Sequence, residues 1–336
     1  MRILRYILIR LLYVLPVLFG VTVMVFIISH AIPGDPAKMI AGPKASREAV
    51  ENIRKQHGLD KPLTVQYFRF ASGLLKGDLG NSIRNHRPVT SDLNDFFPAT
   101  LELTLASVLI CFSIGIPLGI ISAVRRNKLT DHLIRIFSVC GVSMPVFWLG
   151  LMLLLVFYRN LGWLPGSGRL DIDFSPPVYV TGLYLIDTLI EGRVDKFLNT
   201  ASHIVMPAFC LSYVYLGIMT RIVRSSMIEV LGLDYIVTAK ANGISEWMVV
   251  LKHAFKNSLI PTITITGLSV GELLGGAILT ETIFGWPGMG KYVVDSVNYL
   301  DFPAIMGFTL IVSLVYVSIN LFVDVLYAFL NPKITY

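Results

Sequence analysis

Six long stretches of this sequence, five wholly free of Asp, Glu, Lys and Arg and one broken by a single Glu, constrain the fold most strongly. Each approaches or exceeds the roughly 20 apolar residues that a helix needs to cross about 30 Å of hydrocarbon. Charged residues make up only 15% of the chain, whereas a soluble domain carries about 25%. We therefore predict an all-α integral membrane protein with six transmembrane helices. The stretches are Leu11–Gly34, Leu103–Val124, Ile136–Tyr158, Phe197–Thr220, Asn257–Thr280 across Glu272, and Phe302–Val323.

Basic residues gather beside particular stretches, and this asymmetry predicts the orientation of the chain. Loops rich in Lys and Arg near the spans stay in the cytoplasm, so both termini and two loops are expected there. The first stretch is longer than the apolar core of a secretory signal, which favours an uncleaved span. The basic residues are Arg2, Arg5 and Arg10 before the first stretch, Arg125, Arg126 and Lys128 after the second, and Arg221, Arg224, Lys240, Lys252 and Lys256 between the fourth and fifth.

The predicted organisation has three parts: transmembrane helix 1 over 1–34, an extracytoplasmic helical segment over 35–95 and a membrane core over 96–328. Within the second part, Ser46–Gly58 and Pro62–Lys76 have the start and stop residues of short surface helices. Val178–Ile190 is apolar but short, and an interfacial helix fits it better than a seventh span. The core helices are expected near 99–124, 133–158, 203–224, 258–283 and 303–328, with a cytoplasmic segment over 226–257.

Two short motifs suggest enzymes, and neither has the context that an enzyme requires. GWPGMGK at 285–291 satisfies G-x-x-x-x-G-K, but Tyr292 replaces the Mg²⁺-binding Ser or Thr, and no flanking strand or following helix is evident. We interpret Gly285–Gly290 as a tight external turn. GLSVG at 267–271 matches the nucleophile elbow but lies inside a predicted membrane helix, which argues against Ser269 as a nucleophile. Every fourth residue there is a glycine, and this spacing predicts close helix packing through Gly267, Gly271 and Gly275.

The segment from Asp234 to Pro261 predicts a rigid cytoplasmic lever. Asp234 can cap a short helix that stops at Asn242-Gly243, and Ser245 can cap a second helix running to Pro261 at the start of a span. Several apolar residues there would remain exposed, which suggests a protein partner rather than a solvated loop. These residues are Ile236, Val237, Ile244, Trp247 and Met248.

Motifs along nearly the whole chain resemble the membrane permease subunits of ATP-binding-cassette importers, dipeptide and oligopeptide branch. The family's cytoplasmic signature of E-A-A, Gly, His, Asn and Pro corresponds to Val237, Thr238, Ala239, Gly243, His253, Asn257 and Pro261. The leading Glu is absent, as is usual in the peptide branch. Further matching motifs are IPGDP, GLDKP, GDLGNS, ATLEL, SMPVFWLG, RSSMIEVL and LTETIFGWPGMG, and TGLYLIDT is similar to the B-type subunit of dipeptide permeases.

The resemblance implies a type I importer fold and half of a translocation path across the inner membrane of a bacterium. The implied partners are a homologous second permease, two cytoplasmic ATPases that bind ATP and Mg²⁺, and an extracytoplasmic substrate-binding protein. This chain would itself bind no cofactor or metal and perform no catalysis. Nucleic-acid binding is disfavoured, because the basic residues follow topology. The coupling residues implied are Asp234, Thr238, Ala239, Lys240, Gly243, Ser245, Glu246, His253, Asn257 and Pro261.

Glu272 interrupts the fifth stretch, where an ionised side chain should face other helices or water. It either lines the path, together with Ser269 and Met144, or makes an interhelical hydrogen bond. Glu102 and Asp324 lie near stretch ends, where a solvated or paired role is expected. Relatives in this branch import dipeptides, longer peptides, glutathione, nickel complexes or haem, so the sequence leaves the cargo open; an intramembrane serine hydrolase is a distant alternative.

Overall fold

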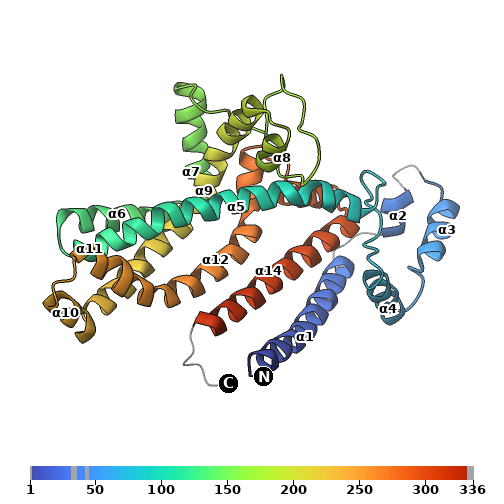
Figure 1. The fold of residues 1–336 in the computed structure, drawn as a ribbon. Coiled ribbons are helices and arrows are strands. Elements are labelled where there is room, and N and C mark those ends of the chain that lie inside the picture. The colour runs from blue at the N-terminus through green and yellow to red at the C-terminus, as the bar shows by residue number, and fades with distance from the viewer. Residues whose placement is uncertain (1, 32–35, 42–44, 331–336) are drawn as a thin grey trace. The chain divides into compact units, whose positions relative to one another are not determined.

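The computed structural model describes residues 2–31, 36–41 and 45–330, and its regular structure is helical (Figure 1). No strand occurs in these ranges; a single isolated bridge pairs Asn81 with Pro88. The predicted all-α class is confirmed. The long helices are α1 (Arg2–Ala31), α5 (Val89–Val124), α9 (Val194–Leu231), α12 (Lys256–Ile283) and α14 (Phe302–Leu330).

Among the described residues, four helices are long and apolar enough to cross a membrane: α5, α9, and the parts Leu11–His30 of α1 and Phe302–Val325 of α14. A bent pair makes a fifth candidate if it is a single span. The six spans predicted from composition are therefore supported in part, and their number and orientation stay a prediction.

The bent pair consists of α6 (Leu129–Ser143) and α7 (Val146–Leu153), the latter continuing as a π-helical turn, η1 (Leu154–Asn160). The two halves meet at 107°, so the helix expected near 133–158 is broken between Ser143 and Val146. The cause is local: a residue that precedes proline is driven out of the helical region. Met144, before Pro145, has ψ 125° and ends α6.

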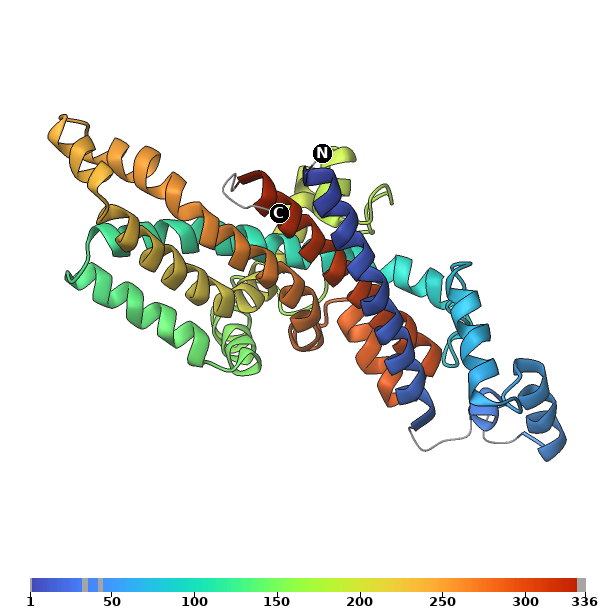
Figure 2. The same ribbon diagram turned by 90° about the horizontal axis from the view of Figure 1, so that it is seen from below.

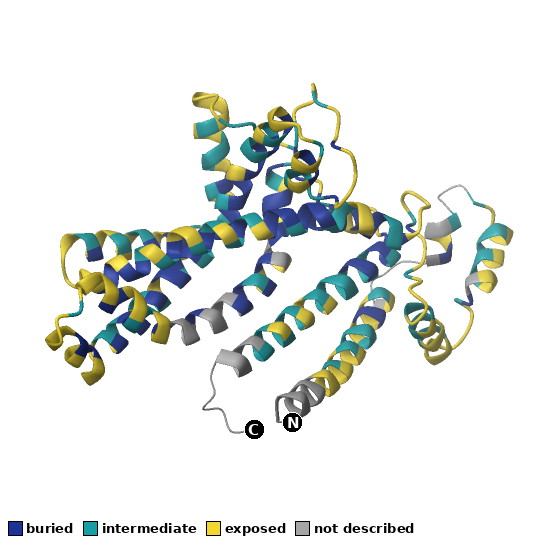
Figure 3. Cartoon of the chain, viewed as in Figure 1, coloured by how far each residue is buried: buried dark blue, intermediate teal, exposed yellow. Residues whose placement is uncertain are grey.

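The chain divides into two compact units. The first comprises residues 1–7, 98–291 and 318–336, and within it α9 packs against both α6 and α12 (Figures 1 and 2). Buried side chains concentrate on α9 (Figure 3). One core cluster joins α5 and α9 to the segment that follows α9, through residues such as Leu216, Val223, Met227, Ile236 and Val250.

Short helices complete the first unit: α8 (Tyr184–Ile190), α10 (Asp234–Ala241), α11 (Glu246–Met248) and a π-helical segment, η2 (Val249–Phe255). The interfacial helix expected over Val178–Ile190 begins only at Tyr184. Gly182 has φ +77° and Leu183 is extended, which a continuous helix does not permit.

The second unit comprises residues 8–97 and 292–317. It contains α2 (Pro36–Ala41), α3 (Arg47–His57), α4 (Leu63–Leu74) and most of α13 (Met289–Asn298). Both predicted surface helices are confirmed. The Ser46 hydroxyl accepts a hydrogen bond from the Ala49 amide, and Gly58 ends α3 with φ +68°.

Candidate functional site

The signature segment expected in the cytoplasm forms a short helix, α10, joined by a sharp turn to the long helix α11–η2–α12 (Figure 1). The predicted bounds Asp234–Ala241 are confirmed. Gly243 has φ +75°, a conformation that a side chain would strain, whereas Asn242 does not adopt it. Asp234 is the first helical residue rather than the N-cap, which is Leu233, and Ser245 holds the next N-cap position without a capping hydrogen bond.

Two buried side chains attach α10 to the helix bundle. Ile236 is fully buried and Ala239 is 7% exposed, and both belong to the core cluster that contains Val230, Val249 and Val250. The expectation that Ile236 would be exposed was wrong. Ile244 is also partly buried against this cluster.

Hydrogen bonds make a second attachment between α10 and the start of α12. The Asn257 side-chain amide donates to the Tyr235 hydroxyl at 2.7 Å and to the His253 carbonyl at 2.9 Å. The Tyr235 hydroxyl also donates to that carbonyl, at 3.3 Å. Apolar packing on one face and this network on another leave α10 little freedom to rotate independently of α9 and α12.

The outer surface of the lever carries exposed apolar side chains. Val237 is 61% exposed, Trp247 71% and Met248 48%. An exposed apolar surface of this kind is characteristic of a protein interface. Other exposed residues of this surface are Leu233, Tyr235, Thr238, Lys240, Ser245, Glu246 and Leu251.

Pro261 lies inside α12 rather than at its beginning, since the helix starts at Lys256. The helix from Glu246 to Ile283 is continuous, and its segment Val249–Phe255 is π-helical. Turns of this type often mark functional sites within longer helices. His253 lies in this segment, half-buried.

The stretch GWPGMGK encloses the carboxyl group of a side chain from the same protein, Glu281. Glu281 is fully buried; one of its oxygens accepts from the Thr100 hydroxyl at 2.6 Å and the other from the Lys291 amide at 3.0 Å. The Met289 amide donates to Thr100 at 2.8 Å, at the start of α13. Hydrogen bonds thus join Thr100, Glu281, Met289 and Lys291.

Helix α13 begins at Met289, so the predicted turn over Gly285–Gly290 is shorter than expected, and a helix does follow it. A side chain at Gly288 would collide with the Glu281 carboxylate, and one at Gly290 with the backbone of Ile278. The glycines and the helix amino terminus that resemble a phosphate loop therefore pack around the Glu281 carboxyl group.

Further polar pairs fix the long connection between α7 and α9. The buried Arg169 guanidinium donates to Glu102 and to the Gly182 carbonyl, and Glu102 accepts from the Leu185 amide at 2.7 Å. Glu102 thus forms an ion pair with Arg169, which is one of the two roles expected from the sequence. Although burial alone would raise the pKa of Asp187, hydrogen bonds from the hydroxyl and amide of Thr181 and from two further amides hold that pKa below its ordinary value.

The residues expected along the translocation path are spread over the first unit. Glu272 is exposed on α12 and accepts a hydrogen bond from the Tyr215 hydroxyl of α9. Ser269 is buried on the same helix, and Met144 is half-buried at the α6–α7 bend. Both alternatives for Glu272 therefore stay open. Since Ser269 lies within a helix, the strained strand-to-helix turn of a nucleophile elbow is absent here.

The glycine face of α12 is packed at one end. A side chain at Gly267 would collide with Val323, and Gly271 is buried, whereas an added Cβ at Gly275 meets no described atom within 4 Å. Close packing is thus seen at Gly267, and Gly275 does not contribute to it within the described chain.

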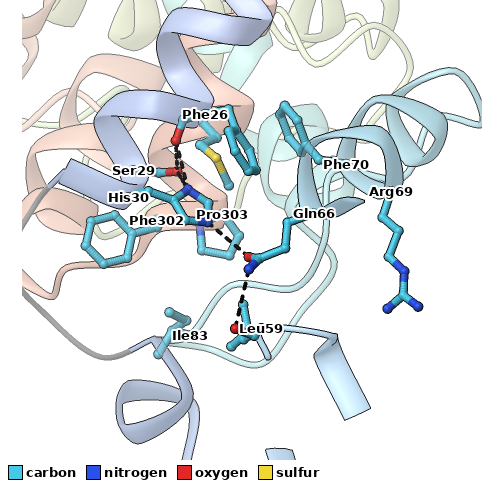
Figure 4. Close-up of a pocket in the computed structure, with 11 residues that line it drawn as sticks. Phe26, Ser29, His30, Leu59, Gln66, Arg69, Phe70, Ile83, Phe302 and Pro303 are labelled. Carbon is cyan, nitrogen blue, oxygen red and sulfur yellow. Dashed lines mark hydrogen bonds between the residues drawn. The ribbon is translucent and has the colours of Figure 1, made fainter. Parts of the chain in front are cut away.

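A cavity of about 280 Å³ lies in the second unit, among α1, α4 and the start of α14 (Figure 4). Its polar groups are already paired: His30 contacts the Phe26 carbonyl at 2.8 Å and the Gln66 side chain at 3.2 Å. Arg69 points away from the other lining side chains (Figure 4). The cavity is therefore mostly apolar, and its His30 and Gln66 side chains are already hydrogen-bonded.

No cluster of His, Cys, Asp and Glu in the described ranges is arranged to hold a metal ion. Of the three cysteines, Cys111 and Cys210 are buried and Cys140 is exposed.

Comparison with known proteins identifies the family and the fold of the chain. The family described as "Binding-protein-dependent transport system inner membrane component" matches residues 115–336, and its N-terminal counterpart matches residues 3–104. A solved chain from inward-facing conformations of the MetNI methionine ABC transporter has a TM-score of 0.50 and 15% identity, covering 69% of this chain and 93% of that chain. At this identity the likeness shows the fold alone, that of an ABC importer permease.

Relatives of known name match over nearly their full length. The probable D,D-dipeptide transport system permease protein DdpB of Escherichia coli K12 is 55% identical over 95% of this chain and 94% of its own. The dipeptide permease DppB of Alkalihalophilus pseudofirmus is 45% identical over 97% and 98%. The glutathione permease GsiC of Escherichia coli O6:H1 is 41% identical over 99% of each. The chain therefore belongs to the family of binding-protein-dependent transport system inner membrane components.

Proposed function

We propose that this chain forms half of the translocation path of an ATP-binding-cassette importer for dipeptides or short peptides. It pairs with a homologous second permease, and an extracytoplasmic binding protein delivers the cargo. Two cytoplasmic ATPases bind ATP and Mg²⁺ and supply the energy, so this chain performs no catalysis and binds no cofactor itself.

The observation that carries this proposal is the double attachment of α10. Its apolar outer surface suits a groove on a partner, while Ile236 and the Asn257 network join it to α9 and α12. A push on such a helix is transmitted to both long helices, which is what alternating access requires.

The membrane arrangement follows from the same assignment. The chain crosses the inner membrane of a bacterium six times with both termini in the cytoplasm, in the three parts 1–34, 35–95 and 96–328. The arginines and lysines before the first stretch, after the second and between the fourth and fifth support this orientation.

A charge placed on the outer surface of α10 tests the proposal. In the complete importer reconstituted in vesicles, Val237→Asp should lower ATPase co-purification and dipeptide uptake at least tenfold, because an unpaired carboxylate would be buried in the interface. Leu75→Asp is the matched control, since Leu75 is 92% exposed and lies after α4 in the other unit. Normal uptake and normal ATPase retention in Val237→Asp would exclude α10 as the docking element.

The cargo class is supported by the relatives, which include permeases named for D,D-dipeptides, dipeptides and glutathione. Competition of labelled L-alanyl-L-alanine uptake by D-alanyl-D-alanine and by glutathione distinguishes these peptides. Glu272→Gln in the same assay tests whether Glu272 lines the translocation path. Altered uptake of charged relative to neutral peptides would place Glu272 on the path. Unchanged kinetics for both would leave Glu272 only its hydrogen bond with Tyr215.

A further inference from the structure

A second cavity of about 280 Å³ lies between α6 and α9 in the first unit. Hydroxyl, guanidinium and aliphatic groups line it together. Its apolar wall includes Ile134, Val139 and Val142, and its basic residues are Arg135, Arg221 and Arg224. The two helices approach closely beside it, since a side chain at Gly217 would collide with the Ser138 carbonyl.

One of the three arginines is already neutralised. Arg224 donates to both oxygens of the fully buried Asp131, at 2.7 and 2.8 Å. Asp131 also accepts from the Ser122 hydroxyl at 2.6 Å and from the Asn127 amide at 2.9 Å. The carboxylate is therefore fully used and has no acceptor capacity left for a second guanidinium.

Arg135 and Arg221 are both exposed, and neither has an ion-pair partner within the described chain. They contribute two uncompensated positive charges to the same cavity. Guanidinium groups bind phosphate in a bidentate geometry and attract it electrostatically. The cavity is thus complementary to an oxyanion.

The surroundings of Arg135 identify the source of the oxyanion. Along α6, Arg135 lies about 9 Å from Leu129 at 1.5 Å per residue, just beyond the basic turn that contains Arg125 and Arg126. The outer face of α6 is apolar, with Ile136 61% and Val139 64% exposed. Such a face suits lipid chains, and with the orientation given under the proposed function the arginines would lie where headgroups meet hydrocarbon.

We propose that this cavity binds the phosphate of an anionic phospholipid from the cytoplasmic leaflet. The phosphate bridges Arg135 of α6 and Arg221 of α9, and the acyl chains lie along Val139 and Val142. Because α9 leads directly into α10, a bound lipid would hold the bent α6–α7 pair against the helix that precedes the lever. Which leaflet supplies the lipid depends on the orientation given under the proposed function, whereas the chemistry of the cavity does not depend on it.

Native mass spectrometry of the delipidated importer complex tests the binding directly. The probes are phosphatidylglycerol and phosphatidylcholine, and the variant is Arg135→Gln/Arg221→Gln. At roughly fivefold per arginine, we expect phosphatidylglycerol binding to weaken about thirtyfold and its preference over phosphatidylcholine to disappear. Arg125→Gln/Arg126→Gln is the control, because it removes the same charge at the same edge but outside the cavity.

Unchanged phosphatidylglycerol binding in the cavity variant, or an equal loss in the control, would overturn the proposal. A cargo carboxylate is the rival occupant. If the cavity variant bound the lipid normally but selectively lost uptake of free dipeptides relative to their C-terminal amides, the cavity would belong to the transport path. The lipid measurement needs no transport, so failure of the importer to take up dipeptides would count against the proposed function alone.

Discussion

Replacing Ile236 by alanine should loosen the lever without unfolding the protein. Ile236 is fully buried, and the other buried residue of α10 is the small Ala239, so most of the apolar attachment of the helix depends on one side chain. Truncating a buried isoleucine to alanine costs about 2 to 5 kcal/mol. We expect the lower part of this range, about 2 to 3 kcal/mol, because an eight-residue helix at the end of the bundle can settle into part of the cavity.

That cost falls on local undocking of α10 rather than on global stability, since the helix contributes only one end of the core cluster. Amide exchange across α10 should therefore accelerate roughly 30- to 150-fold, at tenfold for each 1.4 kcal/mol. Hydrogen–deuterium exchange of the purified importer, compared peptide by peptide with wild type, measures this. Exchange in α9 and in the rest of α12 should change little.

Val237→Ala is the matched control, because Val237 is the next residue and is 61% exposed. With the ATPases removed, so that Val237 lies outside the proposed interface, its exchange should stay within about threefold of wild type, as expected for surface substitutions. In vesicles, Ile236→Ala should lower the dipeptide uptake obtained per ATP hydrolysed. Equal exchange in the two variants, or faster exchange with fully coupled uptake, would refute the view that Ile236 makes α10 a rigid lever.

Three further outcomes follow from local geometry. Gly243→Val forces a β-branched residue into φ +75°, so coupling should fail while the complex still assembles; normal uptake with normal ATPase stimulation would contradict this. Gly288→Ala places a methyl group against the Glu281 carboxyl group and should lower the melting temperature of the importer by several degrees. Gly192→Ala is the control: the space around its Cβ position is open, so it should lower the melting temperature less, through backbone strain alone. Because the pKa of Asp187 is depressed in the folded state, its stabilisation is present above the ordinary carboxyl range and is lost as pH falls through the folded-state pKa. Protection of residues 178–190, measured as exchange relative to the intrinsic rate at each pH, should therefore fall on acidification in wild type and depend less on pH in Asp187→Asn.

Local signals in the sequence were sufficient for several elements. Ser46 and Gly58 mark the two ends of α3, because a hydroxyl cap and a left-handed glycine act within one turn of the chain. The end of α10 follows from Gly243 in the same way. The bend between α6 and α7 follows from Pro145 in the same way, because the residue before a proline is driven out of the helical region.

Contacts between distant segments could not be derived in this way. Thr100 and Glu281 are 181 residues apart, so nothing near either residue indicates that the carboxylate would complete the GWPGMGK turn. Tyr235 likewise gave no local indication that its hydroxyl would meet Asn257. Ile236 appeared exposed because eight residues are too few for helical periodicity to show which face is buried.

By itself the sequence determined that the chain is helical and apolar, and that a short lever ends at a glycine turn. These properties depend on transfer free energies and backbone preferences, which act over a few neighbouring residues. Tertiary structure alone decided which face of the lever is buried, which carboxylate completes the turn and which arginines stay unpaired. Those outcomes depend on side chains brought together by the packing of α5, α6, α9 and α12, a long-range property that no local pattern encodes.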